Sequence, residues 1–251
     1  KIAFRNKDLS RICVFTTNND LFNETAMDNL NIHYVNGFSG GIKRHFNPAM
    51  FNYTYSKRMD VSIDKYEPVE NMVYFYKIHG SVNWIDDDQD DSNFFSIMED
   101  TNPEWKEEKN ILIYPTPTKQ NKSLGAPYVD LFREFQHRLL EPNTVLFVMG
   151  YGFNDEHVND IIYRALATNT TFNLVVIDHI GEEKPICKID DKRIFRLWGE
   201  VENPVEGKDN IQMHYFDYTV KEWLPNLNAF AQEEKIVKDF VKGIKEISKT
   251  V

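Results

Sequence analysis

Residues suited to nucleotide or sugar chemistry follow four apolar, strand-like segments of this sequence. The four polar groups are Asn18-Asn19-Asp20, His79-Gly80, Gly150-Tyr151-Gly152 and Asp178. In an open α/β sheet, ligands bind beyond the carboxyl ends of the strands. We therefore expect the four groups to converge on one ligand site.

His79 is the candidate general base of this site. Its imidazole titrates near neutrality and can take a proton from a hydroxyl group or from water. Gly80 would allow a ligand to approach the backbone closely, because glycine has no Cβ. The alternative is a structural histidine whose nitrogens are bonded at a strand end, and the residue type alone favours that alternative.

Asn18 and Asp20 can orient a ribose or a water molecule through hydrogen bonds. Asparagine and aspartate are also common in strand-to-helix turns and at helix caps, so both interpretations stay open for these two residues. For Asn19 we prefer the turn interpretation.

The segment Gly150-Tyr151-Gly152 leads directly into a predicted helix. Backbone amides at such a place can face phosphate or ribose oxygens, helped by the helix dipole. Asp178 ends a predicted central strand, where an acid can accept hydrogen bonds from ribose hydroxyls or simply close the strand. We expect Asp155 to cap the helix and His157 to be structural.

Apolar spacing predicts the elements that position these residues. Strands are predicted over 11–17, 32–35, 51–55, 72–78, 111–114, 144–149, 172–177, 193–197 and 211–216, and helices over 21–30, 129–140, 155–166 and 233–247. The almost wholly apolar segment 144–149 is typical of the covered centre of a parallel sheet. The alternation predicts an α/β protein with a doubly wound, mostly parallel sheet, a small helical or irregular insertion and a C-terminal helix.

The length of 251 residues suits one core with a small appendage. We expect a domain over residues 1–228. Residues 229–251 would add an amphipathic helix that packs on the domain edge or mediates assembly.

Composition excludes several classes of function. The net charge of -10 argues against direct nucleic-acid binding, which depends on accumulated lysine and arginine. No apolar run approaches the roughly 18 residues that a membrane span needs, and the beginning of the sequence has no signal-peptide pattern. Two cysteines are too few for a disulfide scaffold or a four-cysteine zinc site, and the acidic run at 86–91 is best interpreted as a solvated loop. We expect a cytoplasmic protein without a bound metal.

Three ordered motifs resemble those of sirtuin-like domains, above all the bacterial defence-associated sirtuins. They are Thr16-Thr17-Asn18-Asn19-Asp20, Lys77-Ile78-His79-Gly80-Ser81 and the run from Gly150 to Asn159, and the resemblance extends from about Arg11 to Asp178. It implies a Rossmann-like core that takes NAD as its substrate and cleaves the nicotinamide glycosidic bond through an oxocarbenium-like state.

The resemblance also assigns roles to residues. His79 would be the essential catalytic histidine, and Asn18 would position the ribose or the attacking water. The substrate-binding positions carried over in the same way are Thr17, Asp20, Gly80, Gly150, Tyr151 and Asp178.

The sequence departs from the family pattern in two places. It has no Gly-Ala-Gly-x-Ser loop upstream of the first motif, so either the sequence begins late, which we favour, or this phosphate-binding loop is disordered or lost. It also lacks the four cysteines of the zinc module of deacylase sirtuins, which places protein deacylation behind NAD hydrolysis.

From the resemblance we expect an NAD glycohydrolase that acts as a toxic effector in antiphage defence. It would be a homo-oligomer, with a helicase-like ATPase, an Argonaute-like protein or a phage protein as a possible partner. Three alternatives remain: an NAD-dependent protein deacylase, a non-catalytic NAD or ADP-ribose-binding assembly module, and a scaffold that joins its partner through the C-terminal helix.

Overall fold

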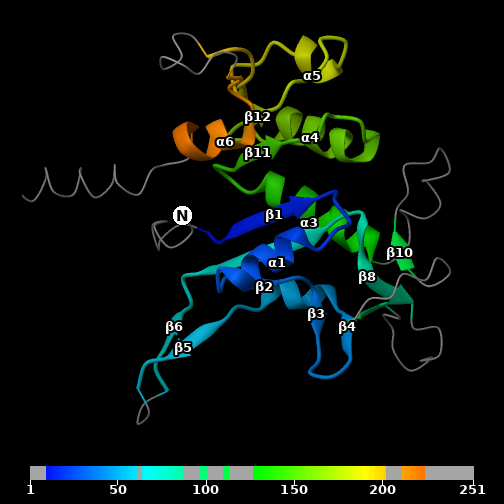
Figure 1. Ribbon diagram of the computed structural model, residues 1–251, viewed down its shortest axis with the longest axis vertical. Coiled ribbons are helices and arrows are strands. Elements are labelled where there is room, and N and C mark those ends of the chain that lie inside the picture. Colours follow the sequence, from blue (N-terminus) through cyan, green and yellow to red (C-terminus); the bar gives the residue numbers. More distant parts are fainter. Residues whose placement is uncertain are drawn as a thin grey trace, which may run out of the picture. The chain divides into compact units, whose positions relative to one another are not determined.

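The computed structural model describes residues 10–60, 64–86, 97–100, 110–112, 127–201 and 211–223 (Figure 1). The chain divides into two compact units, residues 2–141 and residues 142–251. The predicted helix over 233–247 and residues 87–91 of the acidic run lie outside the described residues.

A parallel sheet organises the first unit. It contains β1 (Ile12–Thr16), β7 (Met72–Lys77) and β2 (His33–Val35), in the order β1-β7-β2. The central strand β7 is buried at every position except Tyr74. These strands confirm the predictions at 11–17, 32–35 and 72–78, and the polar loops after β1 and β7 therefore start from neighbouring strand ends.

Each face of this sheet carries a helix, α1 (Phe22–Asn29) or α3 (Tyr128–Leu140). Met27 of α1 packs with Val73 and Phe75 in one apolar cluster. Phe135 of α3 contacts the ring of Phe15, with the ring centroids 4.8 Å apart. Because Phe15 pairs with Tyr76, and side chains alternate along a strand, α3 covers the face opposite to Val73 and Phe75.

The chain leaves β7 for a second, antiparallel sheet in the order β10-β8-β9-β4-β3. Its strands are β3 (Phe38–Ser39), β4 (Arg44–Phe46), β8 (Gly80–Asp86), β9 (Ile97–Glu99) and β10 (Asn110–Leu112), and a separate hairpin is formed by β5 (Ser56–Arg58) and β6 (Tyr66–Pro68). Only Ile78 and His79 separate β7 from β8. His79 therefore lies where the chain passes from one sheet to the other.

The predicted strand over 51–55 is wrong. Residues Pro48–Asn52 form a 3-10 helix, and the next strand, β5, begins at Ser56. The side chain of Asn47 accepts a hydrogen bond from the amide of Ala49 at 2.9 Å, and Pro48 follows at the first helical position. This asparagine–proline start favours a helical turn over an extended strand.

A second parallel sheet organises the second unit. It contains β11 (Val145–Met149), β12 (Asn173–Ile177) and β13 (Ile194–Arg196), in that order, and confirms the strands predicted at 144–149, 172–177 and 193–197. The helix α4 (Glu156–Thr168) connects β11 to β12 along the chain. The short helix α5 (Pro185–Lys188) follows β12.

Two expectations for this unit need correction. The covered central strand of the sheet is β12, whereas β11 lies at an edge and exposes 48% of Val145 and 54% of Phe147. The predicted strand over 211–216 is wrong: Gln212 forms an isolated bridge to Glu200, and α6 (Phe216–Tyr218) and a π-helical turn (Thr219–Trp223) follow. Short apolar runs do not separate strand from helix by their spacing.

The described elements together show a mixed α/β protein that includes two parallel three-stranded sheets.

Candidate functional site

The loop after β1 is bonded directly to the turn after β7. The amide of Ile78 donates to the carbonyl of Thr16 at 3.0 Å, and the amide of Val82 donates to the carbonyl of Asn19 at the same distance. With its amide nitrogen facing the turn, Asn19 also donates to the carbonyls of His79 at 3.0 Å and Gly80 at 3.2 Å. The two sequence motifs thus form one structural unit, and Asn19 has the turn role expected of it.

Asn18 and Asp20 are oriented by this loop in different ways. The backbone amide of Asn18 donates to Oγ1 of Thr16 at 3.0 Å, and its side chain is exposed. Oδ1 of Asp20 accepts from the amide of Phe22 at 3.0 Å, so Asp20 stabilises the turn into α1. Thr17 between them is partly buried. Of these side chains, Asn18 is the most open to a ligand.

His79 is only 9% exposed. Gly80 follows it with a φ of +84°, in the left-handed region that favours glycine. The left-handed backbone conformation of the turn after His79 therefore explains why residue 80 is a glycine. The imidazole Nε2 is itself buried.

A buried ion pair beside this turn was not predicted from the sequence. Lys77, whose side chain is 3% exposed, donates from Nζ to Oε1 of Glu24 at 2.8 Å and to Oγ of Ser81 at 2.7 Å. It also donates to the carbonyl of Asp20, and the carbonyl of Asn19 lies 3.4 Å from Nζ. Burial lowers the pKa of Lys77, and the hydrogen bond and charge of Glu24 oppose that shift.

A signal for this pair was present in the sequence. Lys77 is the one charged residue in the apolar segment 72–78. Lysine is almost never fully buried without a partner, so a lysine in a covered strand predicts a nearby carboxylate. Only the folded structure identifies Glu24 as this carboxylate.

The second unit brings together the Gly150–Gly152 turn and Asp178. Met149 of β11 pairs with Ile177 of β12, so the two parallel strands end side by side. The amide of Gly152 donates to Oδ2 of Asp178 at 3.0 Å. This amide is thus occupied by a carboxylate of the protein.

Backbone conformation accounts for the glycines of this turn. Gly150, Gly152 and Phe153 have φ values of +63°, +69° and +52°. A Cβ added at Gly150 would meet nothing within 4 Å, so its glycine is explained by conformation and not by close packing.

Tyr151 points its hydroxyl back into the start of α4. The oxygen lies 3.0 Å from the carbonyl of Asp155 and 3.1 Å from Oδ1 of Asn159. Oδ1 of Asp155 accepts from the amides of His157 at 2.9 Å and Val158 at 3.3 Å, which confirms Asp155 as the helix cap. Burial raises the pKa of Tyr151, so its hydroxyl stays protonated.

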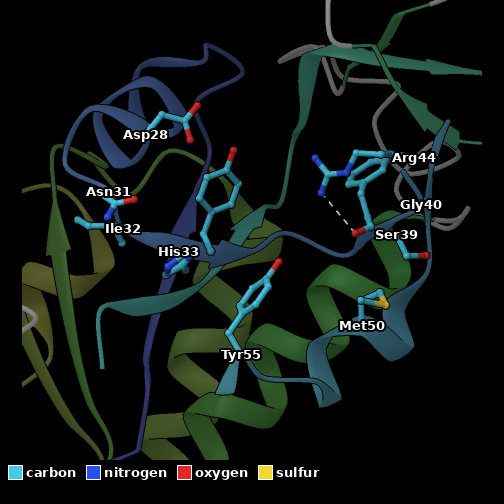
Figure 2. A pocket seen from close by; sticks show the side chains of 11 residues that line it. Asp28, Asn31, Ile32, His33, Ser39, Gly40, Arg44, Met50 and Tyr55 are labelled. Atoms are coloured by element: carbon cyan, nitrogen blue, oxygen red, sulfur yellow. Dashed lines mark hydrogen bonds between the residues drawn. The ribbon is translucent and has the colours of Figure 1, made fainter. Parts of the chain in front are cut away.

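A cavity of about 550 Å³ lies elsewhere in the first unit. Figure 2 shows Asp28, His33, Arg44 and Tyr55 around it, and none of the predicted site residues lines it. His33 begins β2, whereas the loops with Asn18 and His79 follow the ends of parallel strands, at the other edge of the sheet. Arg44 is engaged by Glu99 and by the carbonyl of Phe38 at 3.4 Å. We therefore do not identify this cavity with the predicted site.

Within the part of the chain that the structure describes, no group of three or more histidine, cysteine, aspartate or glutamate side chains is placed to hold a metal ion. In the same residues, every helix is too short or too polar to cross a membrane.

Comparison with protein families identifies a SIR2-like domain. The model of the SIR2-like domain matches residues 12–182, which is more than half of the chain and includes the loops of both units described above. No curated protein matches the chain. SIR2-like domains use NAD. On this evidence the chain belongs to the SIR2-like family.

Proposed function

We propose that this chain is an NAD glycohydrolase, which releases nicotinamide from NAD and transfers the ADP-ribosyl group to water. The observation that supports this most is the bonded pair of loops after β1 and β7, because it places Asn18 and His79 at adjacent strand ends.

The chemistry needs little from the protein besides placement and one base. When the glycosidic bond breaks, its electron pair moves to the pyridinium nitrogen, and nicotinamide leaves as a neutral molecule. Water then adds to the anomeric carbon of an oxocarbenium-like ribose and loses a proton. In the proposal His79 takes that proton and the exposed amide of Asn18 orients the water or the ribose.

Thr17, Asp20 and Gly80 border the nicotinamide ribose in this proposal. Gly150, Tyr151 and Asp178 would border the adenosine part of NAD, as the resemblance to sirtuins implies. Supporting this, the hydrogen bond from Gly152 fixes one oxygen of Asp178. A doubly wound, mostly parallel sheet belongs to the same proposal.

The test follows nicotinamide and ADP-ribose released from NAD by the full chain, at concentrations high enough for self-association. His79→Ala should reduce release by a factor of about 10²–10⁴, the usual contribution of a general base. His137→Ala is the matched control, since His137 is an exposed histidine in the last turn of α3. Equal activity in the wild type and His79→Ala would disprove the role of His79.

Two further assays separate the alternatives. Acetyl transfer from an acetylated peptide to ADP-ribose would identify a protein deacylase. Calorimetric binding of NAD without nicotinamide release would identify a non-catalytic assembly module.

We extend the proposal to a cytoplasmic, oligomeric effector of antiphage defence, which a partner or assembly activates. The support is the likeness of the three sequence motifs to defence-associated sirtuins. Cells that express the chain should lose NAD after phage infection, and cells with His79→Ala should keep it.

A further inference from the structure

The buried ammonium of Lys77 contacts both loops that the proposed reaction needs. Its Nζ donates to the carbonyl of Asp20 in the loop after β1. It also donates to Oγ of Ser81, two residues beyond His79, at 2.7 Å. Lys77 itself ends β7, two residues before His79. One side chain thus joins the Asn18 loop to both flanks of His79.

The hydrogen-bonding capacity of this ammonium is fully used. An ammonium has three protons, and Glu24, Ser81 and Asp20 supply three acceptors at bonding distance. Ser81 is fully buried, and the side chain of Lys77 is 3% exposed. Lys77 is therefore not available as a nucleophile or as a ligand for substrate, and its contacts point to a role in geometry.

Glu24 serves this arrangement as the counter-charge. Its Oε1 accepts from Lys77 at 2.8 Å, and its Oε2 has no hydrogen-bond partner within the described residues. A buried ion pair contributes little to net stability, because desolvation offsets most of the attraction. Apolar residues of similar volume would fill the same space, so stability alone does not account for a charged pair at this position.

We propose that Lys77 is a positioning residue, which fixes the loop carrying Asn18 against the turn carrying His79 so that both groups act on the same ribose. This inference rests on the proposed NAD glycohydrolase function. Displacement of a reacting group by about 1 Å can reduce a rate about 100-fold, so a loosened loop should reduce kcat with little change in KM.

The decisive variant is the double substitution Lys77→Met with Glu24→Met. It removes both charges together, so no buried charge remains without a partner, and folding stability should stay near that of the wild type. The donor to the carbonyl of Asp20 is nevertheless lost. We expect a kcat about 100-fold below wild type and a KM within about threefold. Lys57→Met, at an exposed lysine of β5, is the matched control and should leave kcat unchanged.

Lys77→Met alone should be less stable than the double variant, since it leaves Glu24 buried and unpaired. If the double variant regains both stability and wild-type kcat, Lys77 is structural only and the proposal is overturned. A double variant with wild-type stability and a low kcat supports the role of Lys77 as a positioning residue.

Hydrogen exchange tests the same inference without catalysis. The amide of Val82 donates to the carbonyl of Asn19, so its exchange reports whether the two loops stay together. In the double variant, Val82 should exchange at least about tenfold faster, while amides inside β7 stay protected. Unchanged protection of Val82 would overturn the proposal. If wild type releases no nicotinamide, the proposed function fails, and this exchange measurement still decides whether Lys77 holds the loops.

Discussion

The two polar loop regions of this protein are held in place by different physical means. In the first unit, the side chains of Lys77 and Asn19 reach across to backbone carbonyls and add to two backbone hydrogen bonds between the loops. In the second unit, backbone conformation holds the turn: Gly150 and Gly152 are left-handed, and one carboxylate, that of Asp178, accepts from the backbone. The first region should therefore be sensitive to lost charges and donors, and the second to an added Cβ.

The strands that carry these regions differ as well. Phe15 of β1 packs against Phe135 of α3. In β11, by contrast, Val145, Phe147 and Met149 are exposed on one face. The first region is thus built on covered strands, and the second on a strand with an open face.

Cysteine reactivity gives the largest expected difference between the strands. Burial raises the pKa of Cys13 in β1 to about 11. At pH 8 its thiolate fraction should be about 100-fold below that of an ordinary thiol, because each pKa unit is a factor of ten. We expect iodoacetamide to label Cys13 slowly in a Cys187→Ser background. Val145→Cys, placed on β11 in a background without Cys13 and Cys187, should react at about the normal rate.

The same shift gives a pH dependence with a defined sign. The folded thiol of Cys13 has the higher pKa, so its contribution to stability is present below about pH 9 and is lost as the pH rises towards 11. Cys13→Ala should reduce the loss of stability measured by urea unfolding between these pH values. In the labelling experiment with iodoacetamide, equal rates for Cys13 and Val145→Cys would contradict the proposed difference between β1 and β11.

An added Cβ in the second region should have the next largest effect. Gly150→Ala should cost about 1–2 kcal/mol, the left-handed penalty for a residue with a side chain, although space for the methyl group is open. Gly150→Asn should cost less, because asparagine visits this conformation more readily. Chemical denaturation of the three proteins should therefore rank wild type above Asn and Asn above Ala. Equal stability of all three would show that conformation does not hold this turn.

Loss of the helix cap should cost about 1 kcal/mol. Asp155→Ala removes the acceptor for the amides of His157 and Val158 at the start of α4. Asp160→Ala, an exposed aspartate of the same helix, is the control and should change the unfolding free energy little. If Asp160→Ala lowers the unfolding free energy as much as Asp155→Ala does, the loss is due to the negative charge on the helix and not to the cap hydrogen bonds.

The smallest effect on stability is expected for Asp178→Asn. The new side-chain carbonyl can still accept from the amide of Gly152, so only the charge-assisted part of the bond is lost, about 0.5–1 kcal/mol. Under the proposed function, the KM for NAD should rise while kcat changes little. A large fall in kcat at constant KM would place Asp178 in the chemistry instead of in adenosine binding.

Patterns within a short stretch of sequence predicted much of this structure. The strands of the two parallel sheets, the helices α1, α3 and α4 and the cap Asp155 were predicted because their signals are local, whereas β3, β4, β5, β6, β8 and β9 were not predicted. The turn chemistry of Asn47 and Pro48 was also local, but the aromatic residues that follow were mistaken for a strand.

Contacts between distant residues could not be predicted. Lys77 and Glu24 are separated by 53 positions, and Gly152 and Asp178 by 26. Pairing of parallel strand ends explained why their loops meet, whereas the particular bonds depend on side-chain directions that spacing does not contain.

The direct passage from β7 to β8 also limits how this site can vary in length. Two residues, Ile78 and His79, connect strands that are both fixed by pairing. If an inserted residue were taken up by a one-residue slip of β8, the buried ring of Trp84 would turn to the opposite face of its sheet. Insertions at His79 should therefore be poorly tolerated, and variation at this site should occur by side-chain replacement.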